Sequence, residues 1–183
     1  MEKNDGKLPL VIMSGGTGSR MNMPDKGLLM IRGETLIGRN LKFLEEVAKP
    51  VYLVVTPNTE ITEKYYSEKL EIIKTPGSGY SEDLGKVLKR INAYPIMVIP
   101  GDIYFSDQEV VNSFIAFAKK SGRGIVSMLI EGLFCGVSIF FSPPDDVKSE
   151  EFQSFDVSEK QAYNVNTVED FFLILNRLKK QKN

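Results

Sequence analysis

Residues 8–37 read LPLVIMSGGTGSRMNMPDKGLLMIRGETLI, an apolar run that passes directly into a glycine-rich segment. The uninterrupted apolar residues at 8–13 predict a short strand that is buried on both faces of a sheet. Gly15, Gly16 and Gly18 follow at once, and they predict a tight turn at the carboxyl end of this strand. Strands buried on both faces are typical of parallel sheets that helices cover on each side.

Strand-like and helix-like segments alternate over the first two thirds of the chain. Thr35 is the expected N-cap of the first helix, and Ser106 with Glu109 has the spacing of a capping box before a later one. This alternation predicts a parallel sheet with helices on both of its faces. The further strands are expected at 51–55, 71–74 and 95–99, and the helices at about 36–47, 60–68, 80–91 and 107–117.

The last third departs from the alternation. The runs 124–130 and 132–141 follow each other with no helix between them, which indicates one antiparallel strand. A polar loop is expected over 142–161, and a final helix over 168–179. We therefore expect one α/β domain over residues 1–183, with a mostly parallel, Rossmann-like, three-layer sheet and a late antiparallel strand.

Composition excludes several classes of function. Among 183 residues, 23 Lys and Arg balance 24 Asp and Glu, and this net charge of −1 argues against a protein that coats nucleic acid or a membrane. The chain has no His, so Ser-His-Asp catalysis and His-ligated zinc are excluded. Its single cysteine, Cys135, cannot form an intrachain disulfide. We expect a cytoplasmic protein because the chain has no disulfide framework, and we expect no membrane insertion because no apolar run approaches about 20 residues.

Glycine-rich and polar loops follow several expected strands, and parallel strands bring such loops to one edge of the sheet, where ligands bind. The glycine loop does not have the spacing of a P-loop. Counted from Gly16, the dinucleotide motif GxGxxG needs a glycine where Met21 stands. By themselves the three glycines also fit a plain tight turn. The loops are SGGTGSR, TPN, PGSGYSED and GD after the strands, and NVN before the last helix.

The wider segment 14–37 resembles the signature of the MobA-like and sugar-phosphate nucleotidyltransferase-like superfamily. Ser14 departs mildly from it, because Ala is usual there. The resemblance implies that Arg20 and Lys26 are catalytic and bind phosphates, where fixed cations stabilise the charge of nucleotidyl transfer; solvated surface charge is the alternative for both. The matching positions are Gly15, Gly16, Arg20, Met21, Lys26, Leu28, Gly33, Leu36 and Ile37. The implied nucleotide contacts of the loop are Gly15, Gly16, Thr17 and Gly18.

Asp102 and two late asparagines are the candidates for a metal site. Mg²⁺ takes hard oxygen ligands and keeps several waters, so a carboxylate, an amide oxygen and substrate phosphates suffice. The resemblance implies a metal-binding Asp at Asp102 and a polar ligand in the late NVNT turn, where Asn166 fits best and Asn164 is close behind. Asp102 as a turn residue and Asn166 as a helix-cap or turn amide are the alternatives.

The loop 76–84, PGSGYSEDL, lies where the resembled superfamily meets the base. A carboxylate accepts hydrogen bonds from the N1–H and N2–H₂ of guanine, so Glu82 and Asp83 are candidates for reading guanine. Both also fit the first turn of a helix, where acidic side chains complement the helix dipole. Tyr80 either stacks on a base or packs, and Asn58 is a candidate to bond the base or the ribose.

Three further segments narrow the resemblance to the adenosylcobinamide-phosphate guanylyltransferase family, over about residues 8–178. They are TPNT (56–59), GSGYSEDL (77–84) and YNVNTVEDF (163–171). The resemblance implies Mg²⁺-dependent transfer of GMP from GTP to cobinamide phosphate, with release of pyrophosphate. The alternatives are a molybdenum-cofactor guanylyltransferase, another NTP:sugar-phosphate nucleotidyltransferase, or a nucleotide-binding module without turnover.

Two features stay open in the sequence. Gly132 and Gly136 fall where the resembled enzymes receive the acceptor, but they equally fit a strand bulge. Phe114, Phe171 and Phe172 fit either the core or the face of a homodimer.

Overall fold

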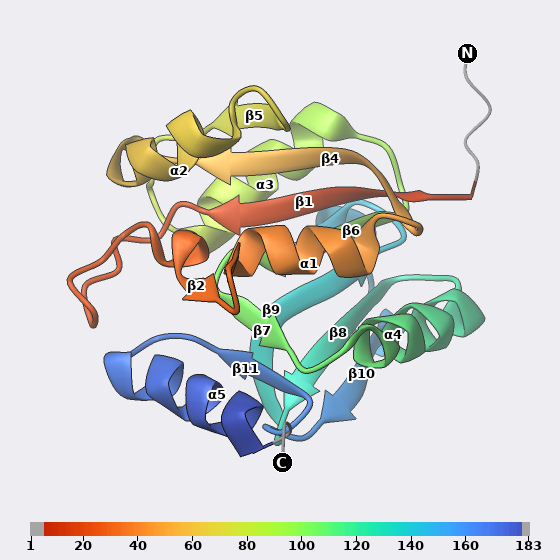
Figure 1. The fold of residues 1–183 in the computed structure, drawn as a ribbon. Coiled ribbons are helices and arrows are strands. Elements are labelled where there is room, and N and C mark those ends of the chain that lie inside the picture. Colours follow the sequence, from red (N-terminus) through yellow and green to blue (C-terminus); the bar gives the residue numbers. More distant parts are fainter. Residues whose placement is uncertain (1–5, 181–183) are drawn as a thin grey trace.

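Seven strands form the central sheet in the order β10–β8–β9–β6–β1–β4–β5 (Figure 1). The computed structural model describes residues 6–180. The strands are β1 (Leu8–Ser14), β2 (Met30–Ile31), β3 (Glu34–Thr35), β4 (Ala48–Val55), β5 (Glu71–Lys74), β6 (Ile96–Pro100), β7 (Ile103–Phe105), β8 (Ile125–Ile130), β9 (Leu133–Phe140), β10 (Phe152–Val157) and β11 (Ala162–Asn164). The α-helices are α1 (Leu36–Leu44), α2 (Glu60–Tyr66), α3 (Tyr80–Ile91), α4 (Gln108–Ser121) and α5 (Val168–Lys180).

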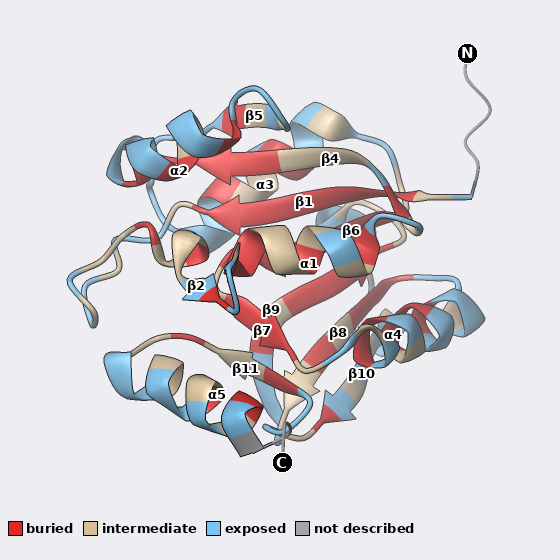
Figure 2. Cartoon of the chain, viewed as in Figure 1, coloured by how far each residue is buried: buried red, intermediate tan, exposed pale blue. Residues whose placement is uncertain are grey.

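Strand β1 is the centre of the parallel part of the sheet. It pairs in parallel with β4 on one side and with β6 on the other, and β4 pairs in parallel with β5. Every residue of β1 is buried, as its apolar sequence predicts (Figure 2). The carboxyl ends of these strands therefore meet at one edge, and the glycine-rich and acidic loops lie along it.

Helices cover both faces of the sheet, which confirms the predicted three-layer α/β arrangement. Residues of α1 and α4, such as Ile37 and Phe114, share one core cluster with strand residues such as Ile12. Val87 and Leu88 of α3 belong to a second cluster on the opposite face. In Figure 1, α1 and α4 accordingly lie in front of the sheet and α3 lies behind it.

The predicted antiparallel member is β9, which runs antiparallel to both β6 and β8. The prediction of a loop over 142–161 is wrong, because β10 lies within it and pairs in parallel with β8. Residues 152–157 alternate between exposed and more buried positions, and the three polar residues of this edge strand made the segment look like a loop.

The start of one helix was predicted one residue too early. Thr35 caps α1 as expected, because its Oγ1 accepts a hydrogen bond from the Gly38 N–H at 2.9 Å. The N-cap of α4 is Asp107 and not Ser106: Asp107 Oδ1 accepts from the Val110 N–H at 3.2 Å. The Ser106 hydroxyl instead donates to the Asp107 carboxylate, so its capping spacing is incidental.

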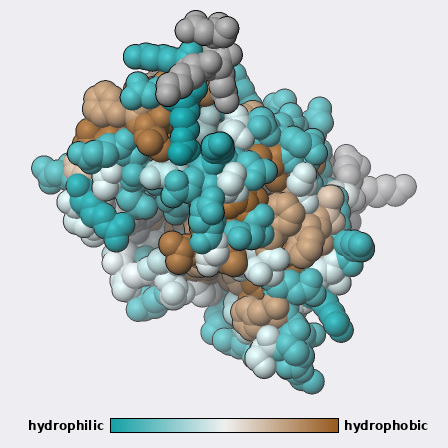
Figure 3. Space-filling view, turned by 90° about the horizontal axis from the view of Figure 1, so that it is seen from below, coloured by the Kyte–Doolittle hydropathy of each residue, from teal (hydrophilic) through white to brown (hydrophobic). Residues whose placement is uncertain are grey.

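The three phenylalanines left open by the sequence have different surroundings. Phe114 is fully buried in the core, and Phe171 packs beside a smaller cluster that includes Ile31 and Ile174 of α5. Phe172 is 57% exposed. The view from below shows apolar side chains in patches that hydrophilic side chains interrupt (Figure 3). Among residues 6–180, no helix is both long enough and apolar enough to cross a bilayer.

Replacing Phe114 tests the packing of α4 on the sheet. Phe114→Ala removes a fully buried ring, so we expect the free energy of unfolding to fall by about 3–5 kcal/mol in urea denaturation. Phe117→Ala, on the same helix but 36% exposed, is the matched control and should cost about 1 kcal/mol. Equal losses in the two variants would contradict the described core.

Candidate functional site

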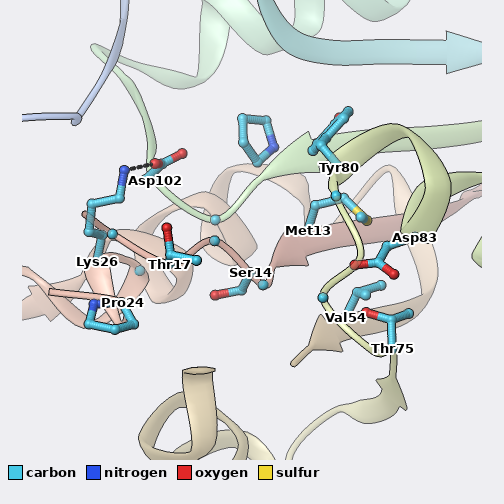
Figure 4. A pocket seen from close by; sticks show the side chains of 18 residues that line it. Met13, Ser14, Thr17, Pro24, Lys26, Val54, Thr75, Tyr80, Asp83 and Asp102 are labelled. Carbon is cyan, nitrogen blue, oxygen red and sulfur yellow. Dashed lines mark hydrogen bonds and ion pairs between the residues drawn. The ribbon is translucent and has the colours of Figure 1, made fainter. Parts of the chain in front are cut away.

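A cavity of about 350 Å³ lies at the carboxyl edge of the sheet. The end of β1, the glycine loop, the start of α3 and the turn after β6 surround it, and Figure 4 shows its lining side chains. Eight predicted site residues line it: Gly15, Gly16, Thr17, Gly18, Lys26, Tyr80, Asp83 and Asp102. The predicted residues therefore mark the glycine loop and both ends of the cavity.

The glycine loop is shaped by close backbone contacts. The Thr56 hydroxyl donates to the Gly15 carbonyl at 3.0 Å, and a Cβ on Gly15 would stand 2.4 Å from Thr56 Cγ2. Gly18 has φ +60° and a Cβ there would stand 2.0 Å from the Met23 carbonyl oxygen. By contrast, a Cβ on Gly16 would meet no described atom within 4 Å. The loop therefore has a fixed course but leaves open space beside Gly16, where a ligand can approach the backbone.

Lys26 joins three distant segments at one end of the cavity. Its ammonium forms an ion pair with the Asp102 carboxylate, donates to the Val165 carbonyl at 3.1 Å, and reaches Asn166 Oδ1 at 3.4 Å. The Lys26 and Asp102 side chains are 13% and 21% exposed. The structure thus brings together a predicted phosphate ligand and two predicted metal ligands, which lie 76 and 140 residues away in sequence.

The helix-cap alternative for Asn166 is wrong. At the start of α5 the Thr167 hydroxyl accepts from the Asp170 N–H at 3.1 Å, while Asp170 Oδ2 accepts from the N–H groups of Asn166 and Thr167. Thr167 and Asp170 therefore satisfy the helix end. The amide side chain of Asn166 is left to face the Lys26 ammonium.

Asn164 lies beside this group and has a different partner. Its Nδ2 donates to the Cys135 carbonyl at 3.0 Å, which links the turn before α5 to β9. Its Oδ1 is buried without a hydrogen-bond partner among the described residues. Asn166 shares the Lys26 ammonium with Asp102, whereas the Asn164 amide is held by the Cys135 carbonyl.

Asp83 lies at the other end of the cavity, at the start of α3. It is 4% exposed, and its Oδ1 is buried with no hydrogen-bond partner in the described part of the chain. A buried acceptor without a partner is costly, because the loss of hydration is not compensated. A ligand that donates hydrogen bonds would remove this cost.

Tyr80 separates the cavity from β9. Its hydroxyl donates to the Gly136 carbonyl at 3.1 Å. The residue keeps 41% of its surface exposed, but desolvation of the phenol raises its pKa, with smaller contributions from Cys135 and the Asp102 carboxylate. Tyr80 therefore stays protonated at neutral pH and remains a donor.

Five predicted residues do not line the cavity: Asn164 and Asn166, described above, and Arg20, Asn58 and Glu82. Arg20 and Asn58 are exposed and lie on loops beside it. Glu82 points to solvent and accepts from Lys86 at 2.7 Å, and this hydrogen bond lowers its pKa. Glu82 is therefore a solvent-exposed residue of the first helix turn, which was the alternative to a role in reading guanine. Asp83, one residue later on the helix, faces inward.

Sequence reasoning missed Asp25, which holds the segment that carries Lys26. Asp25 is 8% exposed, and its Oδ1 accepts from the Thr62 N–H at 2.8 Å and from the Thr62 hydroxyl at 2.6 Å. Thr62 lies in α2, which packs beside β4. Only its position next to Lys26 in the sequence could have pointed to Asp25. The residue that it bonds, Thr62, lies 37 residues away.

The residues around Lys26 fit a hard divalent cation. Asp102 Oδ2, Asn166 Oδ1 and the Val165 carbonyl already gather around one cation, the Lys26 ammonium. All three are hard oxygen donors of the kind that Mg²⁺ prefers. Among residues 6–180 no three acidic or cysteine side chains form a metal-binding group, so water and substrate oxygens would complete the shell.

The model of the MobA-like NTP transferase domain matches residues 10–141, which include the cavity loops from the glycine turn to Asp102. The chain belongs to the MobA-like NTP transferase family. Members of this family are nucleotidyltransferases, and the resemblance of segment 14–37 predicted this activity.

Relatives of this MobA-like transferase cover nearly all of the chain. Adenosylcobinamide-phosphate guanylyltransferase from Methanocaldococcus jannaschii is 26% identical over 93% of this chain and 97% of the relative. CTP:phosphocholine cytidylyltransferase from Streptococcus pneumoniae has a TM-score of 0.71 at 14% identity, covering 94% of this chain and 99% of that one. HddC from Yersinia pseudotuberculosis, complexed with GMP-PN, has a TM-score of 0.65 at 16% identity, covering 93% and 99%. The two structures show that the fold is shared.

Asp25→Ala should loosen the segment that carries Lys26. The change removes both hydrogen bonds to Thr62, so we expect the free energy of unfolding to fall by about 2–3 kcal/mol in urea denaturation. Asp25→Asn keeps an acceptor oxygen at Oδ1 and should lose less. Asp145→Ala, at a side chain that is 78% exposed, is the surface control and should be neutral. A stability of Asp25→Ala equal to that of Asp145→Ala would contradict the anchoring role.

Proposed function

We propose that the chain transfers GMP from GTP to adenosylcobinamide phosphate and releases pyrophosphate. The buried, unpartnered Asp83 carboxylate is the observation that carries the choice of GTP. Guanine presents a pair of donors, N1–H and N2–H₂, to one carboxylate, and the other bases do not. Support for the acceptor comes from similarity over 93% of the chain to a protein named for this reaction.

The cavity orients GTP by placing opposite charges at its two ends. Asp83 lies at the base end, beside Val54 and Thr75, and the Lys26 ammonium lies at the opposite end with Asp102 (Figure 4). The glycine loop lies between them and offers backbone N–H groups to the triphosphate. A nucleotide bound the other way round would place its triphosphate against the Asp83 carboxylate, which is unfavourable.

The transfer needs alignment and charge neutralisation but no general base. An oxygen of the acceptor phosphate, already an anion near neutral pH, forms a bond to the α-phosphorus of GTP. The bond from this phosphorus to the bridging α–β oxygen breaks, and its electron pair leaves with pyrophosphate. Lys26 and the loop N–H groups would stabilise the charge that develops, and Arg20, exposed just after the glycine loop, would add a second cation.

Asp102 and Asn166 would hold Mg²⁺, with Asn164 nearby. A bound Mg²⁺ supplies positive charge to the phosphates and helps to orient them. With Asp102 and Asn166 holding a metal, the Lys26 ammonium would give up two of its acceptors and would be available to the triphosphate.

Product analysis tests the proposed reaction. Incubation with GTP, Mg²⁺ and adenosylcobinamide phosphate should give adenosyl-GDP-cobinamide and pyrophosphate, identified by mass spectrometry. Asp102→Ala should lower turnover by about 10²–10³-fold, because one strong transition-state contact is lost, while Asp145→Ala should not. Turnover only with molybdopterin or a sugar phosphate would contradict the acceptor. Absence of any transfer would favour the nucleotide-binding module.

Asp83 and Glu82 form a matched pair for the choice of base. Asp83→Asn replaces one acceptor oxygen by a donor, so we expect the affinity for GTP to fall about 10–100-fold while that for ATP changes little. Glu82→Gln, on the solvent side of the same helix turn, should leave both affinities unchanged. Calorimetry with each nucleotide and Mg²⁺ measures them. An undiminished preference for GTP in Asp83→Asn would refute guanine reading by this residue.

A further inference from the structure

Thr56 lies between the two loops that form the walls of the nucleotide cavity. It directly follows β4, which lies between β1 and β5 in the sheet (Figure 1). Val55 pairs with the last residue of β1 and with the last residue of β5. One residue further on, Thr56 therefore lies between Gly15, the first residue of the glycine loop, and Thr75, the first residue of the loop that leads to α3.

The side chain of Thr56 contacts both loops from outside the cavity. It is 4% exposed and is not one of the residues that line the cavity. A Cβ on Gly15 would stand 2.4 Å from its methyl carbon Cγ2, and a Cβ on Gly77 would stand 3.5 Å from the same carbon. Gly15 and Gly77 both line the cavity. The Thr56 methyl group therefore packs against two separate segments of the cavity wall.

The hydroxyl of Thr56 fixes the orientation of one peptide unit in the glycine loop. It donates its single hydrogen to the Gly15 carbonyl at 3.0 Å and accepts from the Asn58 N–H at 3.3 Å. The peptide bond between Gly15 and Gly16 is trans, so its N–H points in the direction opposite to its C=O. Because the carbonyl points toward Thr56, the Gly16 N–H points away from Thr56.

The Gly16 N–H is available to a ligand. Within residues 6–180, no oxygen accepts a hydrogen bond from it. Gly16 is exposed and lines the cavity, with open space where a Cβ would stand. Backbone N–H groups in such loops bind anions. Without the Thr56 hydroxyl this peptide could rotate, because a glycine on each side of it permits many backbone conformations.

We propose that Thr56 is a positioning residue, whose hydroxyl holds the Gly15–Gly16 peptide so that the Gly16 N–H donates to a phosphate oxygen of the bound nucleotide. This inference rests on the proposed function and deepens it, because it gives a residue outside the cavity a role in binding the triphosphate. Thr56 is also the N-cap of the 3-10 turn Pro57–Thr59. A residue that only capped this turn would contribute to stability and would not distinguish the phosphates from the base.

Two ligands that differ only in their phosphates provide the test. Thr56→Val keeps the shape of the side chain but loses the hydroxyl, so in calorimetry with Mg²⁺ the affinity for GTP should fall about tenfold while that for guanosine stays within about twofold of the parent. Thr56→Ser keeps the hydroxyl and should stay within about threefold for both ligands.

Thr35→Val is the matched control for loss of a buried threonine hydroxyl. Thr35 is 6% exposed, its hydroxyl also accepts from a backbone N–H, and it is not among the residues that line the cavity. This variant should bind GTP and guanosine as the parent does. Equal losses for the two ligands in Thr56→Val would assign Thr56 a structural role and overturn the inference. An affinity for GTP equal to that of the parent would overturn it as well.

Binding and turnover separate this inference from the proposed reaction. A selective loss of GTP affinity in Thr56→Val, without any turnover in the parent, would support the positioning role and refute the transfer. Turnover in the parent together with an unchanged GTP affinity in Thr56→Val would overturn the positioning role alone. A parent that does not bind GTP would overturn both.

A measurement on the parent protein decides the matter if Thr56→Val does not fold. Inorganic tripolyphosphate should move the Gly16 N–H resonance downfield in the ¹H–¹⁵N spectrum, because the N–H then donates to a phosphate oxygen. The resonance of Gly122, at the C-terminal end of α4, should stay in place. A Gly16 resonance that tripolyphosphate leaves unmoved would overturn the inference.

Discussion

The ion pair between Lys26 and Asp102 holds together the part of the structure that can do chemistry. It joins the end of the glycine segment to the turn after β6, and the hydrogen bonds of Lys26 to Val165 and Asn166 add the turn before α5. The pair is mostly buried, so removing either partner would leave a poorly hydrated charge. The two side chains can also exchange partners. A divalent cation would replace the Lys26 ammonium beside Asp102, and phosphate oxygens would replace the Asp102 carboxylate beside Lys26. A pocket that must bind and release a charged substrate benefits from such a pair.

The two ends of the cavity differ in how their charges are partnered. The Asp83 carboxylate lies at one end, and the Lys26–Asp102 ion pair lies at the other. The ammonium is neutralised by Asp102 before any ligand arrives, whereas Asp83 Oδ1 has no described partner. The two ends therefore differ in kind. At the base end, a buried acceptor has no hydrogen-bond donor. At the phosphate end, the Lys26 ammonium has to separate from Asp102 before it can bind a phosphate.

The sequence predicted what depends on local pattern and missed what depends on contacts between distant residues. The apolar run at 8–13 fits a strand buried on both faces of a sheet, so β1 and the loop at its carboxyl end were predictable. Glu82 and Asp83 both suit a first helix turn, and only the packing of α3 on the sheet decides which one faces inward. Asp25 and Thr62 form a bond between segments with no shared pattern. Strand β10 was missed because three of its six residues, Gln153, Ser154 and Asp156, are polar, as an edge strand tolerates.

Part of one face of strands β8, β9 and β10 has no covering helix, and the order of the strands explains why. A parallel connection needs a crossover, and its helix covers one face of the sheet, as α3 and α4 do. Strand β9 returns directly after β8 through a tight turn at Glu131 and Gly132, so no helix is available to cover this half of the second face. The connection from β9 to β10 contains only two short 3-10 turns. The antiparallel strand β9 of the central sheet thus leaves part of this face without a covering helix, and Phe134 and Phe152 stay 59% and 55% exposed on it.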